Sequence, residues 1–388
     1  MPSMFIGGAE RSLLGLLDSF DFAKYDVNLF LYRHEGEFMD FIPKQVRVLS
    51  EMTSYNTFDV PIKDLLFSKQ FLYGVMRIIG KIALKIHTRI TKEKHGIWMS
   101  MQYTSKYLLP LLPIIPGEYD LAVMFLGIGN VLDKKVNAKT KVTWNHTDYS
   151  ILFPDKRYDL RVLDNIDYIA SVSEPCTEQL LKVHPTLKDK AITVENVLSE
   201  RFLKQQAEMQ VSDMRITDEI ILLSIGRYSD AKNFDNVPDI CRRILKKKIQ
   251  IKWYIIGYGG DELFIRKKIK ENFMEDNVIL LGKKINPYPY IKACDIYVQP
   301  SRYEGKCVTV REAQILNKPV IITKYATSSS QLKDGYDGVI VPMDNEGCAE
   351  GIVRVIKDKD LQQRLIENTK KTDYSNKEEI NKLYQIIE

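Results

Sequence analysis

The chain has 388 residues, of which 45% are hydrophobic and 28% charged. This composition suffices for sizeable cores in about two to three domains, and it excludes a disordered chain, a collagen and a coiled coil. The net charge of +5 is a mild excess of basic residues and gives no reason to expect a nucleic acid as a partner.

The cysteines and the first residues indicate the compartment. Five cysteines occur without a CxxC pair, which favours reduced thiols over a disulfide framework. The N-terminus lacks the basic stretch and the long apolar run of a signal peptide. No apolar run reaches the roughly 18 residues that a membrane span needs. We therefore expect a cytoplasmic protein.

The first predicted helix begins at Gly7 and Gly8 and runs through residues 10–17. In a doubly wound domain such a glycine turn follows the first central strand, but only residues 1–6 precede this one. We therefore expect a truncated first strand, unless the true start lies upstream. Glycines let a backbone approach phosphate closely, so Gly7 and Gly8 are candidate phosphate contacts, although an ordinary turn is the simpler interpretation.

After this helix, short apolar runs alternate with amphipathic segments of helical length, such as 234–247 and 309–316. Several runs are almost wholly apolar, as strands covered on both faces must be. The alternation predicts an α/β fold of parallel sheets with helices on both faces. The predicted strands are 27–31, 121–125, 141–144, 168–172, 220–225, 251–256, 278–281, 296–299, 320–323 and 338–341.

The segment 63–106 is basic and amphipathic. It holds nine lysines and arginines against two acids, interleaved with apolar side chains. A helix of this kind can lie on an anionic membrane surface. The alternative is a solvated helix whose apolar side packs on its own domain. We expect peripheral membrane contact through 63–106, which would place the protein at the inner face of the cytoplasmic membrane.

The domain boundary follows from a change of pattern. The segment 197–217 is polar and has no strand pattern, and a new strand–helix series begins at Glu219. We expect an N-terminal Rossmann-like domain over 1–198 and a C-terminal one over 199–365. The remaining residues, 366–388, are expected to form a helix that packs back toward the N-terminal domain.

His146 is the candidate of the first domain. It follows the predicted strand 141–144, where its ring could bond a sugar hydroxyl or help to order an acceptor. A packed histidine whose ring nitrogens are satisfied is a serious rival interpretation.

A glycine and two cations follow the predicted strand 220–225. Ligands of open α/β sheets bind beyond the carboxyl ends of the strands, where Gly226 frees the backbone. Arg227 and Lys232 could clamp two phosphates and neutralise the charge of a departing nucleotide. Taken alone, such a turn is more often a surface loop. Two further turns, at Gly257 and at Gly282–Lys283, could line a base and ribose pocket, and ordinary strand–helix turns explain them equally well.

The strongest signal is the segment 300–313, which joins the predicted strand 296–299 to a helix. It carries Glu304 and Glu312, separated by seven residues. Glu312 would lie about one turn into the helix, where it could accept from both ribose hydroxyls, and Glu304 would face the sugar. A capping loop with two solvated glutamates explains the spacing equally well. The N–H groups at the helix start are expected to have no intrahelical partner and to suit a diphosphate, namely those of Gly305, Lys306, Cys307, Val308 and Thr309.

Metal chemistry finds little support in the sequence. No HExxH motif or Cys/His cluster occurs, and Asp358-Lys359-Asp360 is interpreted as a solvated pair beside a helix. We expect neither a metal nor another cofactor.

The order of these motifs resembles that of the retaining glycosyltransferases of the GT-B fold, the large family four that builds bacterial capsules and lipopolysaccharides. GGAER comes first, then His146, the GR…K turn, a GxG turn, and Glu304 with Glu312. The run 286–320 is similar to the C-terminal signature of that family. The resemblance implies two Rossmann-like domains facing across a cleft. Between them lies a nucleotide diphosphate sugar donor, with UDP favoured over GDP, and the acceptor is a glycan or a lipid-linked glycan.

The resemblance also implies a role for each candidate and a metal-independent retaining transfer, in which the donor phosphate helps to take the proton of the acceptor hydroxyl. Two departures stand within the motifs, because Cys307 replaces a common glycine and Ala231 a common acid. The implied contacts are Glu312 with the ribose, Glu304 with the donor sugar, Arg227 and Lys232 with the diphosphate, Gly7 and Gly8 with the phosphates from the other domain, and His146 with the sugar or acceptor.

Two other functions remain open from the sequence. A nucleotide-sugar 2-epimerase of the same fold would bind the same donor, although GGAER and the spacing of the two glutamates favour a transferase. A non-catalytic or N-terminally truncated relative is the other alternative, because so few residues precede the first glycine turn.

Overall fold

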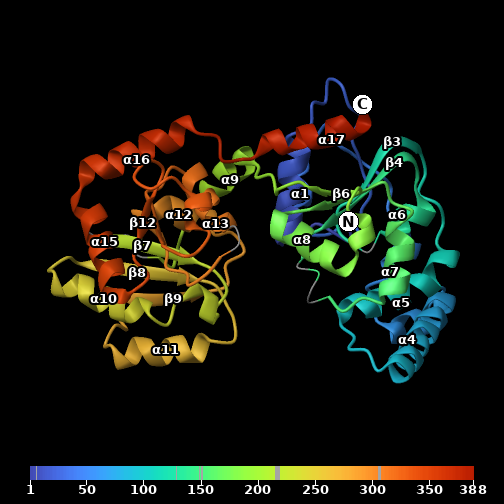
Figure 1. Cartoon of the computed structure of the whole chain (residues 1–388), viewed down its shortest axis with the longest axis horizontal. Helices are drawn as coiled ribbons and strands as arrows, with labels where there is room; N and C mark the ends of the chain where they lie inside the picture. The colour runs from blue at the N-terminus through green and yellow to red at the C-terminus, as the bar shows by residue number, and fades with distance from the viewer. Residues whose placement is uncertain (6, 128, 148, 150–151, 215–218, 305–306) are drawn as a thin grey trace. The chain divides into compact units, whose positions relative to one another are not determined.

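The structure is a computed structural model, which describes residues 1–388 except 6, 128, 148, 150–151, 215–218 and 305–306. The chain divides into two units (Figure 1). Unit 1 comprises Met1–Val197 and Asn376–Glu388, and unit 2 comprises Leu198–Ser375. Every strand pair in both units is parallel, and helices connect the strands, so the predicted α/β class is confirmed.

The C-terminal limits differ from the expected ones. The expected returning segment was 366–388, but the residues that belong with unit 1 begin only at Asn376. The reason is that α16 (Lys359–Lys371) packs in unit 2, where Leu365 is fully buried in the core.

Unit 1 holds a four-stranded parallel sheet in the order β3-β4-β5-β6 and a separate parallel pair, β1 and β2. The strands are β1 (Asn28–Leu29), β2 (Arg47–Val48), β3 (Glu118–Met124), β4 (Asn137–Asn145), β5 (Tyr168–Ser171) and β6 (Ala191–Thr193). The helices are α1 (Gly8–Asp18), α2 (Thr53–Asn56), α3 (Ile62–Leu66), α4 (Phe71–Thr91), α5 (Ile97–Leu108), α6 (Asn130–Lys135), α7 (Lys156–Leu163), α8 (Glu174–Val183) and α17 (Ile380–Ile387).

The first residues run beside the segment 30–35 without forming a strand among the described residues 1–5. The N–H of Tyr32 donates to the carbonyl of Met1 at 3.0 Å, and the N–H of Met4 donates to the carbonyl of Glu35 at 2.9 Å. The side chain of Met4 is fully buried. Where a truncated first strand was expected, the described residues 1–5 are thus a segment hydrogen-bonded to residues 32–38.

The last helix, α17, lies beside α1 in unit 1, as the red and blue helices of Figure 1 show. The ring of Tyr384 stacks on Tyr25 with centroids 4.6 Å apart. The N–H of Asp21 donates to the Tyr384 hydroxyl at 2.8 Å. The C-terminal residues therefore complete the fold of the unit that the N-terminal residues begin.

Unit 2 holds a six-stranded parallel sheet in the order β12-β11-β10-β7-β8-β9. Its core contains buried residues from the strands and from helices such as α10 and α15. The strands are β7 (Ile220–Ile225), β8 (Ile251–Ile256), β9 (Val278–Gly282), β10 (Ile296–Gln299), β11 (Val320–Thr323) and β12 (Val339–Val341). The remaining helices are α9 (Glu200–Ala207), α10 (Val237–Lys246), α11 (Glu262–Glu271), α12 (Tyr288–Ala293), α13 (Val308–Ile315), α14 (Ser328–Gln331) and α15 (Asn345–Lys357).

Candidate functional site

The sheet of unit 2 has a topological switch point between β7 and β10. The chain places β8 and β9 on one side of β7, then returns to place β10, β11 and β12 on the other side. In open parallel sheets, ligands bind beyond the carboxyl ends of the strands at such a point. The residues that follow β7 and β10 include Lys232 and Glu304, so two of the predicted site residues lie at the switch point.

Lys232 and Glu304 form an ion pair between these two loops. Lys232 Nζ lies 2.5 Å from Glu304 Oε1, and the two side chains are only 18% and 11% exposed. The stem of Lys232 lies over Gly226, where a Cβ would stand 3.1 Å from the lysine Cδ. A pair shielded in this way interacts more strongly than an exposed one. Two predicted site residues that are 72 positions apart in the sequence are thus in contact in the folded chain.

Buried polar groups of β10 and the following loop hold the Glu304 carboxylate. The Ser301 hydroxyl donates to Glu304 Oε1 at 2.6 Å, and Gln299 Nε2 donates to Ser301 Oγ at 2.9 Å. The Tyr297 hydroxyl donates to Gln299 Oε1 at 2.7 Å. Burial raises the pKa of Tyr297 well above its ordinary value, so this hydroxyl stays protonated and can donate. These groups, none exposed to solvent, restrict the carboxylate to one orientation.

Arg302 connects the same two loops at their outer edge. Its guanidinium donates to both carboxylate oxygens of Asp235, at 2.9 and 2.7 Å, and to the carbonyl of Asp230 at 2.6 Å. The N–H of Arg302 donates to the carbonyl of Ala231 at 2.8 Å. The hydrogen bonds to the Asp235 carboxylate are the main reason why the pKa of Arg302 is raised. The loop of Glu304 is therefore fastened to the loop of Lys232 on both sides of the ion pair.

At the start of α13, one N–H that was expected to be a free donor has a partner. Cys307 is the N-cap residue, and its N–H donates to Gln331 Oε1 at 2.7 Å. Gln331 Nε2 in turn donates to the carbonyl of Cys307 at 3.3 Å. Val308 is exposed, and Thr309 Oγ1 lies 2.7 Å from the Tyr297 hydroxyl. The other two residues predicted here, Gly305 and Lys306, lie outside the described residues.

Glu312 is buried inside unit 2, with 1% of the residue exposed. The Tyr288 hydroxyl donates to its Oε1 at 2.9 Å. The capping-loop interpretation required a solvated glutamate at this position. The burial of Glu312 therefore excludes that interpretation for this residue. A carboxylate that is removed from water needs hydrogen-bond donors, and Tyr288 of α12 supplies one of them.

Three of the predicted glycines meet where β7, β8 and β9 end. The N–H of Gly226 donates to Ile256, and that of Gly257 donates to the carbonyl of Gly282, both at 3.0 Å. A Cβ built at Gly257 would stand 1.8 Å from the carbonyl oxygen of Gly226. Glycine is required at 257 by this contact between two chain segments, so its presence needs no ligand to explain it.

The remaining cations of these turns are exposed. Arg227 lies on the surface and forms no ion pair with any acid in the described part of the chain. The ammonium of Lys283 lies 5.2 Å from the centre of the Tyr258 ring, which is itself exposed. Both side chains are accessible to a charged ligand at the carboxyl end of the sheet.

In unit 1, a carboxylate occupies the helix start at which a phosphate was expected. Gly7 is the N-cap of α1 and is extended. A Cβ at Gly7 would stand 2.1 Å from Glu10 Oε2, whereas a Cβ at Gly8 would meet nothing within 4 Å. Burial raises the pKa of Glu10. Gly7 therefore lies against a side chain of its own helix.

His146 is packed between aromatic rings at the end of β4. Its ring stacks on Trp144 and meets Phe125 edge to face. Nε2 lies 2.8 Å from the carbonyl of Phe125, and because a carbonyl only accepts, this nitrogen carries the proton. Burial lowers the pKa of His146 to about 4. Nε2 is thus satisfied within the protein, as expected for a packed histidine. Nδ1 of the neutral ring can accept a hydrogen bond.

No three His, Cys, Asp or Glu side chains gather as metal ligands would, within the residues that the structure describes. Asp358 instead caps a helix, because its carboxylate accepts from the N–H of Leu361. The expected independence of metal remains a prediction.

Residues 206–372 match the family model described as glycosyl transferases group 1. The match extends from the end of α9 to α16 and includes the switch point with Lys232, Glu304 and Glu312. This segment is a group 1 glycosyltransferase domain.

Curated proteins that are similar to this chain bear transferase and synthase names. The Campylobacter jejuni N-acetylgalactosamine-N,N'-diacetylbacillosaminyl-diphospho-undecaprenol 4-alpha-N-acetylgalactosaminyltransferase is 29% identical over 174 residues, which are 44% of this chain and 46% of that protein. The Bacillus anthracis N-acetyl-alpha-D-glucosaminyl L-malate synthase is 23% identical over 245 residues, 61% of this chain and 63% of that protein. The chain thus spans less than two thirds of the length of either relative.

The fold extends beyond the glycosyltransferase domain. The Anabaena protein HepE, solved in complex with UDP and glucose, superposes with a TM-score of 0.56 at 15% identity and covers 99% of this chain and 98% of its own. At this identity the similarity concerns the fold alone. The fold is of the GT-B type, as the motif order implied.

Sequence reasoning missed the residues that support the site of the glycosyltransferase domain. Arg302 and Ser301 stand inside the motif that carries Glu304, but no spacing links them to a partner. Tyr288 and Gln331 act from α12 and α14, which only the folded chain brings to α13. The sequence has no pattern that could reveal Tyr288 and Gln331, because a strand separates each of them from its partner along the chain.

Proposed function

We propose that this protein is a retaining glycosyltransferase. In this proposal it moves a sugar from a UDP-sugar to a hydroxyl of a glycan or lipid-linked glycan during the synthesis of cell-surface polysaccharide. The name of the Campylobacter relative includes an undecaprenol-linked acceptor, and the Anabaena structure contains UDP and glucose. These names support the choice of donor and acceptor class.

The observation that carries the proposal is the Lys232–Glu304 pair at the switch point. A shielded ammonium beside the carboxyl ends of β7 and β10 suits a diphosphate, and a carboxylate 2.5 Å away suits sugar hydroxyls. In this proposal the donor phosphates form an ion pair with the Lys232 ammonium. The Glu304 carboxylate then accepts a hydrogen bond from a sugar hydroxyl, which replaces part of its contact with Lys232. The exposed Arg227 adds a second cation for the same diphosphate.

In the proposed step, the bond from the anomeric carbon to the phosphate oxygen breaks, and a bond to the acceptor oxygen forms on the same face. The acceptor proton passes to the departing phosphate, so the products are the glycoside and protonated UDP. Lys232 and Arg227 stabilise the negative charge that grows on the leaving group. His146 accepts a hydroxyl hydrogen bond at Nδ1 and orients the sugar or the acceptor. This scheme requires no metal.

We also propose that the protein works at the inner face of the cytoplasmic membrane, which it contacts through 63–106. No helix in the described residues combines the length and hydropathy of a membrane span. A lipid-linked acceptor presents its glycan at the membrane surface, so a peripheral contact would bring the acceptor to the enzyme.

The test starts from donor binding. The melting temperature is measured with a panel of UDP-, GDP- and other nucleotide sugars, since a ligand at about 100 times its Kd stabilises by about 2.7 kcal/mol. We expect one UDP-sugar to stand out, and we expect sugar transfer from it to a glycolipid extract. Glu304→Gln should lower that transfer about 100-fold or more. The control is Glu200→Gln, which removes an exposed ion pair on α9 and should leave transfer unchanged.

The same assay separates transfer from epimerisation. A transferase releases UDP only when an acceptor is added, whereas an epimerase returns a changed donor without one. The transferase names of the relatives favour the former. A panel without any stabilising nucleotide sugar, or an epimerised donor without transfer, would contradict the proposal.

A further inference from the structure

The helix α4, of 21 residues, has one face that packs within unit 1. Gly74, Gly80 and Leu84 are its buried residues. A Cβ at Gly80 would stand 3.0 Å from the carbonyl oxygen of Tyr103, so α4 approaches the backbone of α5 closely. Leu84 packs in a cluster with Met99 and Tyr103 of α5. The inner face of α4 is therefore fixed against its neighbour, and its orientation is set.

The opposite face of α4 exposes a stripe of isoleucines. Ile82, Ile86 and Ile90 are 54%, 52% and 76% exposed, and Ile78 precedes them at the same spacing of four. Residues four apart lie on one side of a helix, where a solvated helix carries polar groups. A contiguous exposed apolar patch of this kind marks an interaction surface. Further exposed apolar residues of α4 are Phe71, Leu72 and Ile79.

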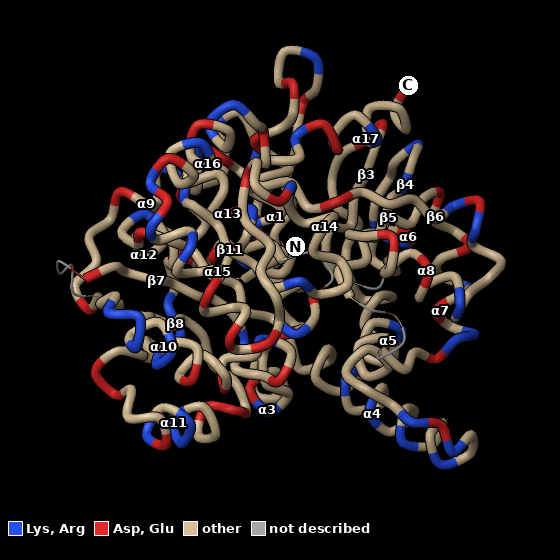
Figure 2. Tube along the Cα trace, turned by 60° about the vertical axis from the view of Figure 1, so that its left-hand side comes forward, with Lys and Arg blue, Asp and Glu red and all other residues tan. Residues whose placement is uncertain are grey.

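Cations border this stripe on the same helix. Lys81, Lys85 and Arg89 are exposed and also spaced by four, so they form a second row beside the isoleucines. No Asp or Glu occurs in α4, and Figure 2 shows the blue cationic positions along it. The three cations pair with no acid among the residues that the structure describes. The outer face of α4 is thus apolar in its middle and positive at its edge.

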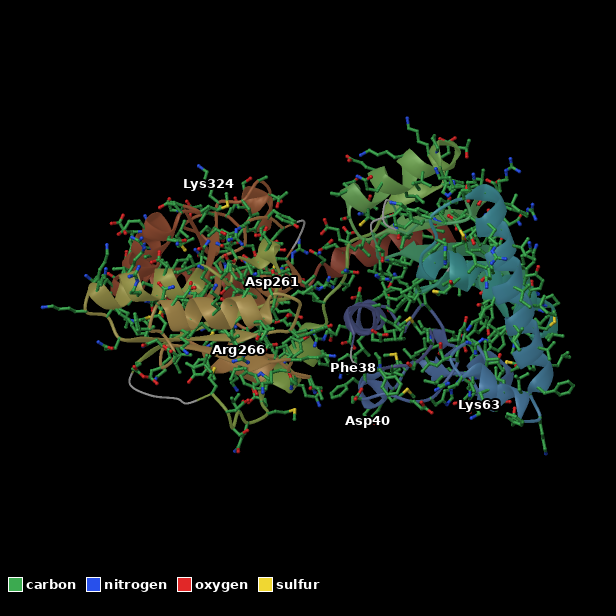
Figure 3. The ribbon with its side chains drawn as sticks, turned by 90° about the horizontal axis from the view of Figure 1, so that it is seen from below. Phe38, Asp40, Lys63, Asp261, Arg266 and Lys324 are labelled. Atoms are coloured by element: carbon green, nitrogen blue, oxygen red, sulfur yellow. The ribbon has the colours of Figure 1, made fainter. Side chains whose placement is uncertain are left out.

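We propose that the outer face of α4 inserts into the surface of an anionic lipid bilayer, with its isoleucines among the acyl chains and its lysines at the headgroups. The helix would lie flat along about 31 Å of the surface. Figure 3 shows α4 as a long blue helix near Lys63, a residue of α3, which packs against it. This inference deepens the membrane contact proposed above, because it names the face and the mode of binding.

The chemistry of the face favours lipid over a protein. A second copy of the chain would bring two positive edges together, which like charges oppose. Protein interfaces carry about one hydrogen bond per 100–200 Å², whereas the side chains of Ile78, Ile82, Ile86 and Ile90 offer none. Acyl chains require no directional partner, and anionic headgroups match the row of Lys81, Lys85 and Arg89.

The test is co-sedimentation of the full chain with phosphatidylcholine vesicles that contain or lack phosphatidylglycerol. Neither donor nor acceptor is present, so failure here is distinct from failure of the proposed sugar transfer. We expect binding to the anionic vesicles only. I82E/I86E should lower the binding about 100-fold, because charges replace the inserting side chains. K81Q/K85Q should lower it about tenfold or more and flatten its dependence on salt.

Two controls keep the result specific. L263E changes an even more exposed apolar residue of α11, the helix that carries Arg266 in Figure 3, and should bind as the wild type does. An unchanged melting temperature shows that the α4 variants fold. In I86W, the added tryptophan should shift its fluorescence to the blue on anionic vesicles, as insertion requires and adsorption through charge alone does not.

Three results would overturn the proposal. The first is a wild type that ignores anionic vesicles. The second is an I82E/I86E variant that binds as well as the wild type, or an I86W variant without a blue shift. The third is a wild-type dimer that I82E/I86E converts to a monomer while vesicles bind neither, since a second copy would then be the occupant.

Discussion

Arg302 holds the loop of Glu304 against the loop of Lys232. Its two-pronged contact with Asp235, at 2.7 and 2.9 Å, uses the planar fork of a guanidinium, which a lysine cannot reproduce. We predict that Arg302→Ala lowers kcat about 10- to 100-fold, because a small displacement of Glu304 relative to Lys232 is costly for transfer. The donor KM should change less. Steady-state kinetics with the donor found by the binding panel measures both.

A double-mutant cycle identifies Arg302 as a positioning residue. Asp235→Asn should have an effect similar to that of Arg302→Ala, and the double variant should be no worse than either single one. Arg302→Lys should recover only part of kcat. Strictly additive losses, or full recovery by lysine, would show that the contact with Asp235 has no such role.

His146 makes the stability of the chain depend on pH. Its pKa is lowered to about 4 by burial, and unfolding returns it to about 6.5. Between these pH values the unfolded chain binds more protons than the folded chain does, so the free energy of unfolding rises with pH. The full gain in stability is present above about pH 6.5. We predict that His146→Asn removes this dependence, up to about 3 kcal/mol.

Urea unfolding at about pH 5 and about pH 7 tests the prediction for His146. The wild type should gain more stability between the two values than His146→Asn does. His95, which is exposed and follows α4, provides the control, since His95→Asn should keep the wild-type dependence on pH. Equal slopes for the wild type and His146→Asn would contradict the assignment.

At the scale of elements, the ends of β7 and β8 meet so closely that only glycine fits at 257. A Cβ there would stand 1.8 Å from the carbonyl oxygen of Gly226, and a backbone carbonyl cannot rotate away as a side chain can. We predict that Gly257→Ala destabilises unit 2 by about 1–3 kcal/mol, through the movement that overpacking forces. Gly260→Ala is the matched control, because a Cβ at Gly260 meets nothing within 4 Å. Thermal unfolding compares the two, and equal melting temperatures would refute the argument.

The elements of unit 2 could be predicted because their physics is local. Strands buried on both faces are continuous apolar runs, and β7, β8 and β10 begin and end at the predicted residues. Helix α9 was missed inside the polar segment 197–217. This helix has only eight residues, so its periodic pattern in the sequence is short. The Ser199 hydroxyl caps it by accepting from the N–H of Phe202, and its buried face packs on α12. A helix of this length depends on its tertiary partner.

The candidate site was predictable as a set of residue types and not as a set of contacts. Lys232 and Glu304 were both named from their turns, but each was expected to meet a ligand, and nothing local indicates that they meet each other across 72 residues. The N–H of Cys307 was expected to be free, but it donates to the side chain of Gln331, which is 24 residues away in the sequence. Side-chain partners at such separations are set by the order of strands in the sheet.

At the scale of the whole molecule, the chain crosses from unit 1 to unit 2 and returns. The polar composition of 197–217 indicated the first crossing, whereas the return at Asn376 had no compositional signal. It follows from packing: Leu365 of α16 is buried in unit 2, and Leu383 of α17 is buried in unit 1. The stability of unit 1 therefore depends on residues at both ends of the chain.

This dependence gives a prediction for Tyr384, whose ring lies 4.6 Å from that of Tyr25 and whose hydroxyl accepts from Asp21. Tyr384→Phe should cost about 1 kcal/mol, through the hydrogen bonds of the hydroxyl with Asp21 and Ser19, and Tyr384→Ala about 2 kcal/mol or more, through the stacked ring as well. Hydrogen exchange followed by mass spectrometry should report lost protection in α1 and residues 19–25, with β7 and β8 unchanged. Tyr374→Phe is the matched control, since its hydroxyl donates to Asp337 within unit 2 and its loss should affect exchange only there. Exchange that rises equally in both units after Tyr384→Ala would show that the last helix does not belong to the first unit alone.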